Sequence, residues 1–234
     1  MFSKSARIYD AIYSWKDYVA ESAAIHTLIQ QHKRTPGNTL LDAACGTGQH
    51  ARRLRAHYAV EGFDLDTELL AVARERCPNC AFYVADMVDF DLGKQYDAVT
   101  CLFSAIGYVV TAERLNAAIV SMARHVKPGG VLIVEAWFSP DEFRSEGVFS
   151  RFVEEPDLRI ARMHAGHVEG NISYLDFHYM VGTPEGVEYF TEQHKLGLFT
   201  VEQYRAAFDA AGLETTYDPQ GISGRGLYIG VKPT

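Results

Sequence analysis

The stretch that decides the fold is Leu40-Leu41-Asp42-Ala43-Ala44-Cys45-Gly46-Thr47-Gly48-Gln49-His50. Apolar residues lead into an acid, a glycine pair follows, and a helical pattern then runs from Gln49 to His57. This order is typical of a strand, a tight turn and a helix, with glycines where the backbone bends sharply and a ligand approaches closely. Ala51 completes the spacing G-x-G-x-x-A, one form of the dinucleotide-type fingerprint.

Asp42 indicates which ligand this turn serves, because it lies at the strand end, four residues before the first glycine. An NAD site directs a helix N-terminus at pyrophosphate and gains nothing from a carboxylate at that point. The same carboxylate suits an ammonium or sulfonium ligand. The turn therefore predicts S-adenosylmethionine, and an NAD-dependent oxidoreductase is the weaker interpretation.

Two further acids follow the next strands of the pattern. Residues 58–64 end in Asp64, 22 positions after Asp42, and a carboxylate at about this distance normally binds ribose hydroxyls. The structural alternative for Asp64 is a cap or turn residue. Residues 81–87 form the third strand and its exit, where Asp86 can bind an adenine amino group while Met87 covers the ring.

The remaining pattern predicts a single α/β domain over residues 1–234, with a Rossmann-like, doubly wound sheet and its ligands at the carboxyl strand ends. Residues 1–35 predict an N-terminal helical lid, with one helix within 1–15 and another from Lys16-Asp17-Tyr18 to about Lys33. Residues 36–148 form the cofactor-binding core, in which Lys127-Pro128-Gly129-Gly130 predicts a turn before the last strand.

The pattern changes after the core. Residues 149–198 lack helical periodicity, and the stretches 159–167, 172–181 and 187–196 predict an inserted antiparallel β cover. Residues 199–234 predict a helix that begins at a capping box on Thr200, followed by a hairpin that closes the sheet.

Composition excludes several classes of partner. The formal net charge of −8 argues against a nucleic-acid surface, which needs clustered Lys and Arg. No apolar run approaches the roughly 20 residues of a membrane span, and the first residues lack an apolar signal core, so we expect a cytoplasmic protein without membrane contact. Cys77 and Cys80 close a helix, and His164, His178 and His194 lack metal spacing, so no metal site is expected.

The opening motif, Asp64, Asp86-Met87 and the KPGG segment together resemble class I methyltransferases that use S-adenosylmethionine. Further segments narrow the resemblance: Tyr9-Asp10, Lys16-Asp17-Tyr18, DMVDF, FSAIGY, EAWFSP and SGRGL. They resemble the N,N-dimethyltransferases of nucleotide-linked aminosugars in desosamine and mycaminose biosynthesis, which act on a dTDP-3-amino-3,6-dideoxyhexose. The resemblance implies antibiotic biosynthesis and a homodimer joined through the inserted strands.

The residues and the resemblance together give a set of candidate site residues. The cofactor site would comprise Tyr9, Tyr18, Asp42, Ala43, Gly46, Gly48, Asp64, Leu65, Asp86, Met87 and Leu102. The acceptor site would comprise Tyr13, Phe103, Ser104, Trp137, Arg162, His178, Ser223 and Arg225, with Tyr108 as the catalytic residue. Arg225 is the first choice for the nucleotide diphosphate, because flanking glycines expose its backbone, and Arg162 is the second.

Methyl transfer to an amine moves positive charge from sulfur to nitrogen and needs no oxyanion hole. Alignment of the two reactants can lower the barrier by roughly 7–11 kcal/mol. We therefore expect catalysis mainly by positioning, with Tyr108 or water relaying the departing proton. Two alternatives stay open: a class I methyltransferase of another small O- or N-acceptor, and a cofactor-binding module without turnover.

Overall fold

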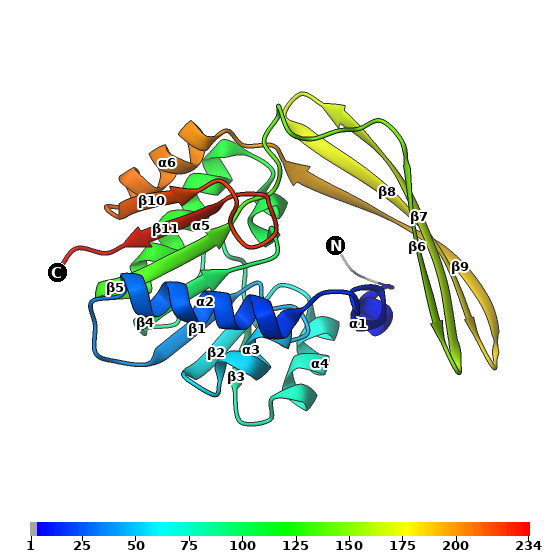
Figure 1. Ribbon diagram of the computed structural model, residues 1–234, viewed down its shortest axis with the longest axis horizontal. Coiled ribbons are helices and arrows are strands. Elements are labelled where there is room, and N and C mark those ends of the chain that lie inside the picture. The colour runs from blue at the N-terminus through cyan, green and yellow to red at the C-terminus, as the bar shows by residue number, and fades with distance from the viewer. Residues whose placement is uncertain (1–3) are drawn as a thin grey trace.

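The protein is built from two β-sheets with a short helical segment between them, as the computed structural model of residues 4–234 shows (Figure 1). The larger sheet has seven strands in the order β10-β11-β5-β4-β1-β2-β3, and the smaller has four in the order β6-β7-β8-β9. The predicted fold class, a Rossmann-like sheet with an inserted antiparallel cover, is confirmed.

Five parallel strands form the centre of the large sheet. They are β1 (Thr39–Ala43), β2 (Ala59–Asp64), β3 (Ala81–Val84), β4 (Tyr96–Cys101) and β5 (Val126–Glu135). Every residue of β4 is buried, as expected for a strand covered by helices on both faces. The C-terminal hairpin of β10 (Glu214–Asp218) and β11 (Leu227–Val231) adds to β5 in antiparallel fashion and closes the sheet as predicted.

Helices cover both faces of this sheet. The helices α2 (Tyr18–His32), α3 (Gln49–Leu54) and α4 (Thr67–Arg76) pack on one face, and α5 (Ala112–Arg124) and α6 (Val201–Ala210) on the other. Their starts follow local capping chemistry. The Asp66 side chain accepts hydrogen bonds from the backbone N–H groups of Glu68 and Leu69, and Thr200 forms the predicted capping box with Gln203.

The cover is an antiparallel meander of β6 (Val148–Glu155), β7 (Leu158–Glu169), β8 (Ile172–Thr183) and β9 (Gly186–Gly197). Burial alternates along β8, with odd-numbered residues from Ser173 to Val181 buried and even-numbered ones facing outward. The inner face packs on Ile8 and Ile12 of the lid, which comprises η1 (Ala6–Ile8) and α1 (Tyr9–Ile12). In Figure 1, α1 lies between the two sheets.

The helix expected within residues 1–15 is present as η1 and α1, and residues 1–3 lie outside the described part. Two other local predictions were wrong. The helix expected to reach His57 ends at Leu54. The turn expected at Lys127–Gly130 lies inside β5, where the register with β4 shifts, because Arg34 and Lys232 hydrogen-bond the backbone of Gly129 and hold the bulged segment to the sheet.

No helix within residues 4–234 is long and apolar enough to cross a membrane.

Candidate functional site

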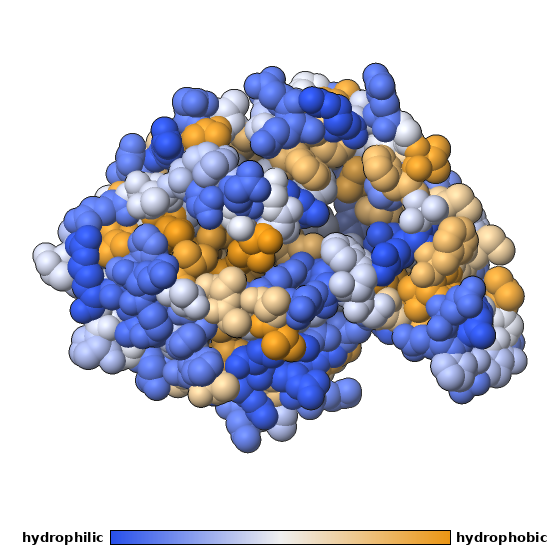
Figure 2. Space-filling view, in the orientation of Figure 1, coloured by the Kyte–Doolittle hydropathy of each residue, from blue (hydrophilic) through white to orange (hydrophobic). Residues whose placement is uncertain are grey.

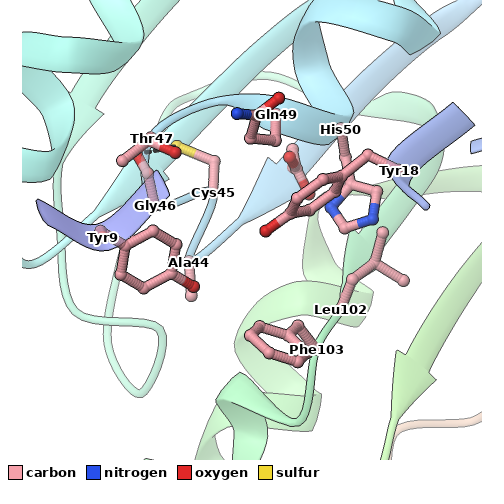
Figure 3. Close-up of a pocket in the computed structure, with 11 residues that line it drawn as sticks. Tyr9, Tyr18, Ala44, Cys45, Gly46, Thr47, Gln49, His50, Leu102 and Phe103 are labelled. Atoms are coloured by element: carbon pink, nitrogen blue, oxygen red, sulfur yellow. Dashed lines mark hydrogen bonds between the residues drawn. The ribbon is translucent and has the colours of Figure 1, made fainter. Parts of the chain in front are cut away.

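A cavity of about 640 Å³ lies between the carboxyl ends of the parallel strands and the inner face of the cover. Figure 2 shows the molecule hollowed between the two sheets. A smaller pocket adjoins it at the glycine turn, where Tyr9 and Tyr18 lie on either side of residues 44–47 and Leu102 and Phe103 lie opposite (Figure 3). The larger volume is in the range of small-molecule sites.

The glycine turn is shaped for close approach by a ligand. Gly46 has a φ of +54°, and a Cβ atom there would meet no described atom within 4 Å. Three residues beside it, Ala44, Phe103 and Ser104, also have positive φ although they carry side chains. Such backbone strain is concentrated at ligand sites, because it is retained only where the surrounding structure enforces it.

Asp42 faces the smaller pocket with an unsatisfied oxygen. Its Oδ1 accepts a hydrogen bond from Thr100 Oγ1 at 3.0 Å, while its buried Oδ2 has no partner among residues 4–234. Burial raises the pKa of this carboxyl to about 6, against the opposing effects of His50 and Thr100. A buried carboxylate oxygen without a partner fits an incoming ammonium group, which would satisfy it.

The ribose and adenine end of the predicted site lies along the next two strand ends. Asp64 accepts hydrogen bonds from the backbone N–H of Gly46 at 2.8 Å and of Asp66 at 2.9 Å. Each carboxylate oxygen can accept a further bond, so the side chain can still meet ribose hydroxyls. Asp86 forms an ion pair with Arg114 at 3.1 Å, and Met87 lies beside it in the wall of the cavity.

Arg225 is a cation in the wall of the large cavity. Its Nη1 donates a hydrogen bond to Ser104 Oγ at 3.0 Å, and its guanidinium lies 5.0 Å from the ring centroid of Trp137. Burial lowers the pKa of Arg225, but an arginine stays protonated. Among the described residues no carboxylate forms a salt bridge with it, so its charge is open to an anionic ligand.

Arg162 reaches the same cavity from β7. It lies 5.0 Å from the ring centroid of Phe177 and donates a long hydrogen bond of 3.4 Å to the Tyr13 hydroxyl. Tyr13 in turn packs edge-on against Phe103 at 5.1 Å. Arg162, the second residue predicted to bind the diphosphate, therefore also lines the large cavity.

Most of the predicted site residues line these two cavities together. They are Tyr9, Tyr13, Tyr18, Asp42, Gly46, Asp64, Leu65, Asp86, Met87, Leu102, Phe103, Ser104, Tyr108, Trp137, Arg162 and Arg225.

Four predicted residues do not line the cavities. Ala43 is buried within β1, and Gly48 is the N-cap of α3, where an added Cβ would lie 3.2 Å from that of Ala73. His178 is exposed on the outer face of β8, because its even position points away from the cavity. Ser223 bonds Glu135, which in turn accepts the backbone N–H of Phe103. We therefore remove these four from the direct site.

Sequence reasoning missed two groups that complete the site. His194 of β9 lies 2.5 Å from the Tyr108 hydroxyl, whereas the sequence spacing only argues against His194 as a metal ligand. Asp10 holds the lid to the glycine turn, accepting hydrogen bonds from Thr47 Oγ1 at 2.8 Å and Gln49 Nε2 at 3.1 Å, and pairing with Arg76. The only sequence signal for Asp10 was its position beside Tyr9.

Replacing Asp10 by Ala should raise the dissociation constant for S-adenosylmethionine about tenfold or more. The change removes charge-assisted hydrogen bonds of about 1.5–3 kcal/mol that hold Tyr9 over the cofactor pocket. Isothermal titration calorimetry measures the effect. Arg7→Ala is the matched control, because it breaks only an exposed ion pair between the lid and Glu188 of the cover. Equal affinities for the two variants would refute the role of Asp10.

A parallel sheet with a glycine turn after its first strand, and acids at the ends of the first three, defines a class I S-adenosylmethionine-dependent methyltransferase. A family model described as a methyltransferase domain matches residues 40–130. The cofactor of this protein is S-adenosylmethionine.

Two relatives are each 40% identical to this chain. The dTDP-3-amino-3,6-dideoxy-alpha-D-glucopyranose N,N-dimethyltransferase of Streptomyces fradiae aligns over 97% of this chain and 90% of its own length. The dTDP-3-amino-3,4,6-trideoxy-alpha-D-glucopyranose N,N-dimethyltransferase of Streptomyces venezuelae aligns over 97% of both. The chain belongs to this family of dTDP-aminosugar N,N-dimethyltransferases.

Two solved structures are similar to this chain over nearly its whole length. The crystal structure of Streptomyces venezuelae DesVI has a TM-score of 0.92 and 38% identity, with 99% of each chain covered. CalS10, an amino pentose methyltransferase involved in calicheamicin biosynthesis whose structure has S-adenosylmethionine bound, has a TM-score of 0.87 and 36% identity, with 96% of each chain covered.

Proposed function

We propose that this enzyme transfers two methyl groups from S-adenosylmethionine to the amino group of a dTDP-linked amino-deoxysugar. The observation that carries this proposal is Arg225, a cation without a carboxylate partner among residues 4–234, held in the wall of the cavity on a protein of net charge −8. A guanidinium in this setting suits a diphosphate, because its planar donors match phosphate oxygens.

The two halves of the cavity would bind different ligands, the cofactor in one and the nucleotide sugar in the other. Asp42 and the backbone around Gly46 would hold the methionine part of the cofactor, Asp64 and Leu65 the ribose, and Asp86 with Met87 the adenine. Arg225 and Arg162 would hold the diphosphate.

Aromatic side chains and alignment would supply most of the rate. Tyr13, Phe103 and Trp137 would exclude water from the acceptor half. When bound, S-adenosylmethionine supplies an electrophilic methyl group for in-line attack by the neutral amine. Holding the two reactants in line is worth roughly 7–11 kcal/mol, so positioning accounts for most of the acceleration.

Incubation of the enzyme and S-adenosylmethionine with three sugar nucleotides, followed by mass spectrometry, tests the substrate class. We expect methylation of dTDP-3-amino-3,6-dideoxy-α-D-glucopyranose or of dTDP-4-amino-2,3,4,6-tetradeoxy-D-glucose, and none of dTDP-glucose, which lacks an amine. Methylation of dTDP-glucose would favour the O-methyltransferase alternative. Cofactor binding without transfer to any sugar would favour a module without turnover.

The homodimer is supported by the outer face of the cover. Large apolar side chains are exposed there on all four strands: Val148, Phe152, Met163, Met180, Val187 and Tyr189. An apolar face of this kind is typical of a protein–protein interface. A cytoplasmic enzyme of antibiotic biosynthesis fits the four free cysteines and the cofactor.

A charge introduced on this outer face should produce a monomer. Phe152 is 63% exposed, and Phe152→Lys would bury a charge in the interface. Analytical ultracentrifugation should find a dimer for the unmodified enzyme and a monomer for this variant. Val84→Lys, at a 54% exposed position on the large sheet, should remain dimeric. A monomeric unmodified enzyme at micromolar concentration would contradict the proposal.

A further inference from the structure

A chain of three polar side chains leads from the cavity wall into the cover. The Tyr108 hydroxyl lies 2.5 Å from Nδ1 of His194, and Nε2 of His194 lies 3.6 Å from Oε2 of Glu192. Tyr108 comes from η2 (Ala105–Val109), whereas His194 and Glu192 are alternate residues of β9 on its inner face. Tyr108 and His194 both line the large cavity. The chain therefore begins where an acceptor amine would be held.

Glu192 is held as a carboxylate by the N-terminal segment. Its Oε2 accepts a hydrogen bond from Ser5 Oγ at 2.6 Å, and its Oε1 accepts the backbone N–H groups of Lys4 at 2.8 Å and Ser5 at 3.0 Å. Burial alone would raise the pKa of Glu192, but hydrogen bonds from His194, Ser5 and the Lys4 backbone outweigh it and lower the pKa to about 2. Glu192 is ionised at neutral pH.

His194 is a neutral imidazole at neutral pH with a defined orientation. Burial lowers its pKa, although Glu192 opposes this effect, and the Arg162 guanidinium lowers it further. An ionised Glu192 favours the tautomer that has its N–H on Nε2, facing the carboxylate. Nδ1 then presents its lone pair to the Tyr108 O–H. Burial also raises the pKa of Tyr108 well above 10, so the phenol keeps its proton.

Dimethylation requires a group that removes a proton from the acceptor nitrogen between the two methyl transfers. Attack by a neutral primary amine breaks the S–C bond, forms the N–C bond and leaves a secondary ammonium, which has no lone pair. That ammonium must lose a proton before it can attack a second methyl group. After the second transfer, the tertiary ammonium can leave as it is.

We propose that Tyr108 and His194 remove this proton within the site. The phenol oxygen of Tyr108 takes the proton from the ammonium while its own proton passes to Nδ1 of His194. The resulting imidazolium faces the Glu192 carboxylate through its Nε2–H, and its proton passes to water when the cavity opens for product release. Tyr108 is the catalytic residue, and His194 and Glu192 are positioning residues that act through it. The inference rests on the proposed function, because only an acceptor amine receives a second methyl group and must lose a proton between the two transfers.

The N-terminal segment also contributes to this arrangement of Tyr108, His194 and Glu192. Lys4 and Ser5 supply three hydrogen bonds to Glu192, and the chain then continues directly into the lid that carries Tyr9 and Tyr13. The carboxylate that orients His194 is therefore fixed by the segment that closes the cavity.

The test is the ratio of monomethyl to dimethyl product from dTDP-3-amino-3,6-dideoxy-α-D-glucopyranose, measured by mass spectrometry as a function of pH. The unmodified enzyme should give mainly dimethyl product across neutral pH. Tyr108→Phe and His194→Gln should slow the second transfer by about 100-fold or more at neutral pH, so the monomethyl sugar accumulates. The second transfer should recover as pH rises, because solvent then deprotonates the ammonium. Glu192→Gln should have a smaller effect of the same sign.

A histidine–tyrosine pair on the outer face of the cover provides the matched control. His178 Nδ1 lies 2.6 Å from the Tyr189 hydroxyl, away from the cavity, so His178→Gln should leave the product ratio unchanged. Thermal denaturation and cofactor titration establish that each variant is folded. Tyr108→Phe, which removes one oxygen atom, keeps the test valid if the buried His194→Gln variant does not fold.

Two results would overturn the inference. One is a normal product ratio and pH profile in Tyr108→Phe and His194→Gln. The other is loss of both transfers at every pH in folded variants that bind cofactor, since that indicates a structural role. If the unmodified enzyme methylates no aminosugar, the proposed function itself fails, and this outcome is distinct from the other two.

Discussion

Replacing Asp42 by Asn should weaken S-adenosylmethionine binding at pH 8 by about 30-fold or more. Asp42 is 2% exposed, and its Oδ2 has no partner among residues 4–234. Removing one member of a buried charge pair costs about 2–5 kcal/mol, which corresponds to this change in affinity. S-adenosylhomocysteine should lose the same factor, because it carries the same ammonium group.

The same substitution should raise the stability of the cofactor-free protein. The pKa of Asp42 is about 6 in the folded protein and about 3.9 in an unfolded chain. A raised folded pKa contributes stability that is fully present below about pH 4 and is lost as pH rises through 6. Ionised Asp42 therefore costs the free protein up to about 3 kcal/mol at pH 8. Asp42→Asn recovers only part of this stability. The neutral amide removes the buried charge, but its amide nitrogen also lacks a hydrogen-bond partner.

Calorimetric titration and thermal denaturation at pH 5 and pH 8 measure both effects. Cofactor binding by the unmodified enzyme should be weaker at pH 5, where Asp42 is largely protonated, and Asp42→Asn should lose this difference. Thr100→Val is the control, because it removes a hydrogen bond to Asp42 and keeps the charge. Tight cofactor binding by Asp42→Asn would show that the carboxylate does not contact the ammonium.

Replacing Arg225 by Ala should raise the KM for the nucleotide sugar by about 10- to 150-fold and leave cofactor affinity unchanged. A hydrogen bond to a charged group contributes about 1.5–3 kcal/mol, and the rings of Trp137 and Phe138 around the guanidinium limit its contact with water. The KM of Arg225→Lys should lie between those of the unmodified enzyme and Arg225→Ala, because lysine keeps the charge and loses the planar donors.

Steady-state kinetics with varied sugar nucleotide at saturating cofactor measures this effect. Arg205→Ala is the matched control, since Arg205 lies 5.9 Å from the ring centroid of Tyr217, on α6 and outside the cavity. An unchanged KM in Arg225→Ala would remove Arg225 from the diphosphate site.

The cofactor half of the site could be predicted because its residues follow the chain order of the parallel strands. Asp42 is the next-to-last residue of β1, Asp64 ends β2 and Asp86 follows β3, and the topology alone brings the carboxyl ends of these strands to one edge. Helix starts at Asp66 and Thr200 were also predictable, because capping depends on residues within one turn.

The acceptor half depends on register and docking, which local pattern does not determine. Arg162 pairs with Tyr179 across β7 and β8, so His178 must face the opposite side from Arg162. The sequence alone does not show which residues of the two strands lie opposite each other. Tyr108 meets His194 across 86 positions only because the cover folds back over η2.

The most direct test of the central claim is nuclear magnetic resonance of the product formed from dTDP-3-amino-3,6-dideoxy-α-D-glucopyranose and methyl-labelled S-adenosylmethionine. We predict one labelled signal from two equivalent methyl groups on the sugar nitrogen. A labelled methyl group on a sugar oxygen, or no labelled sugar with any dTDP-aminosugar, would contradict the assignment.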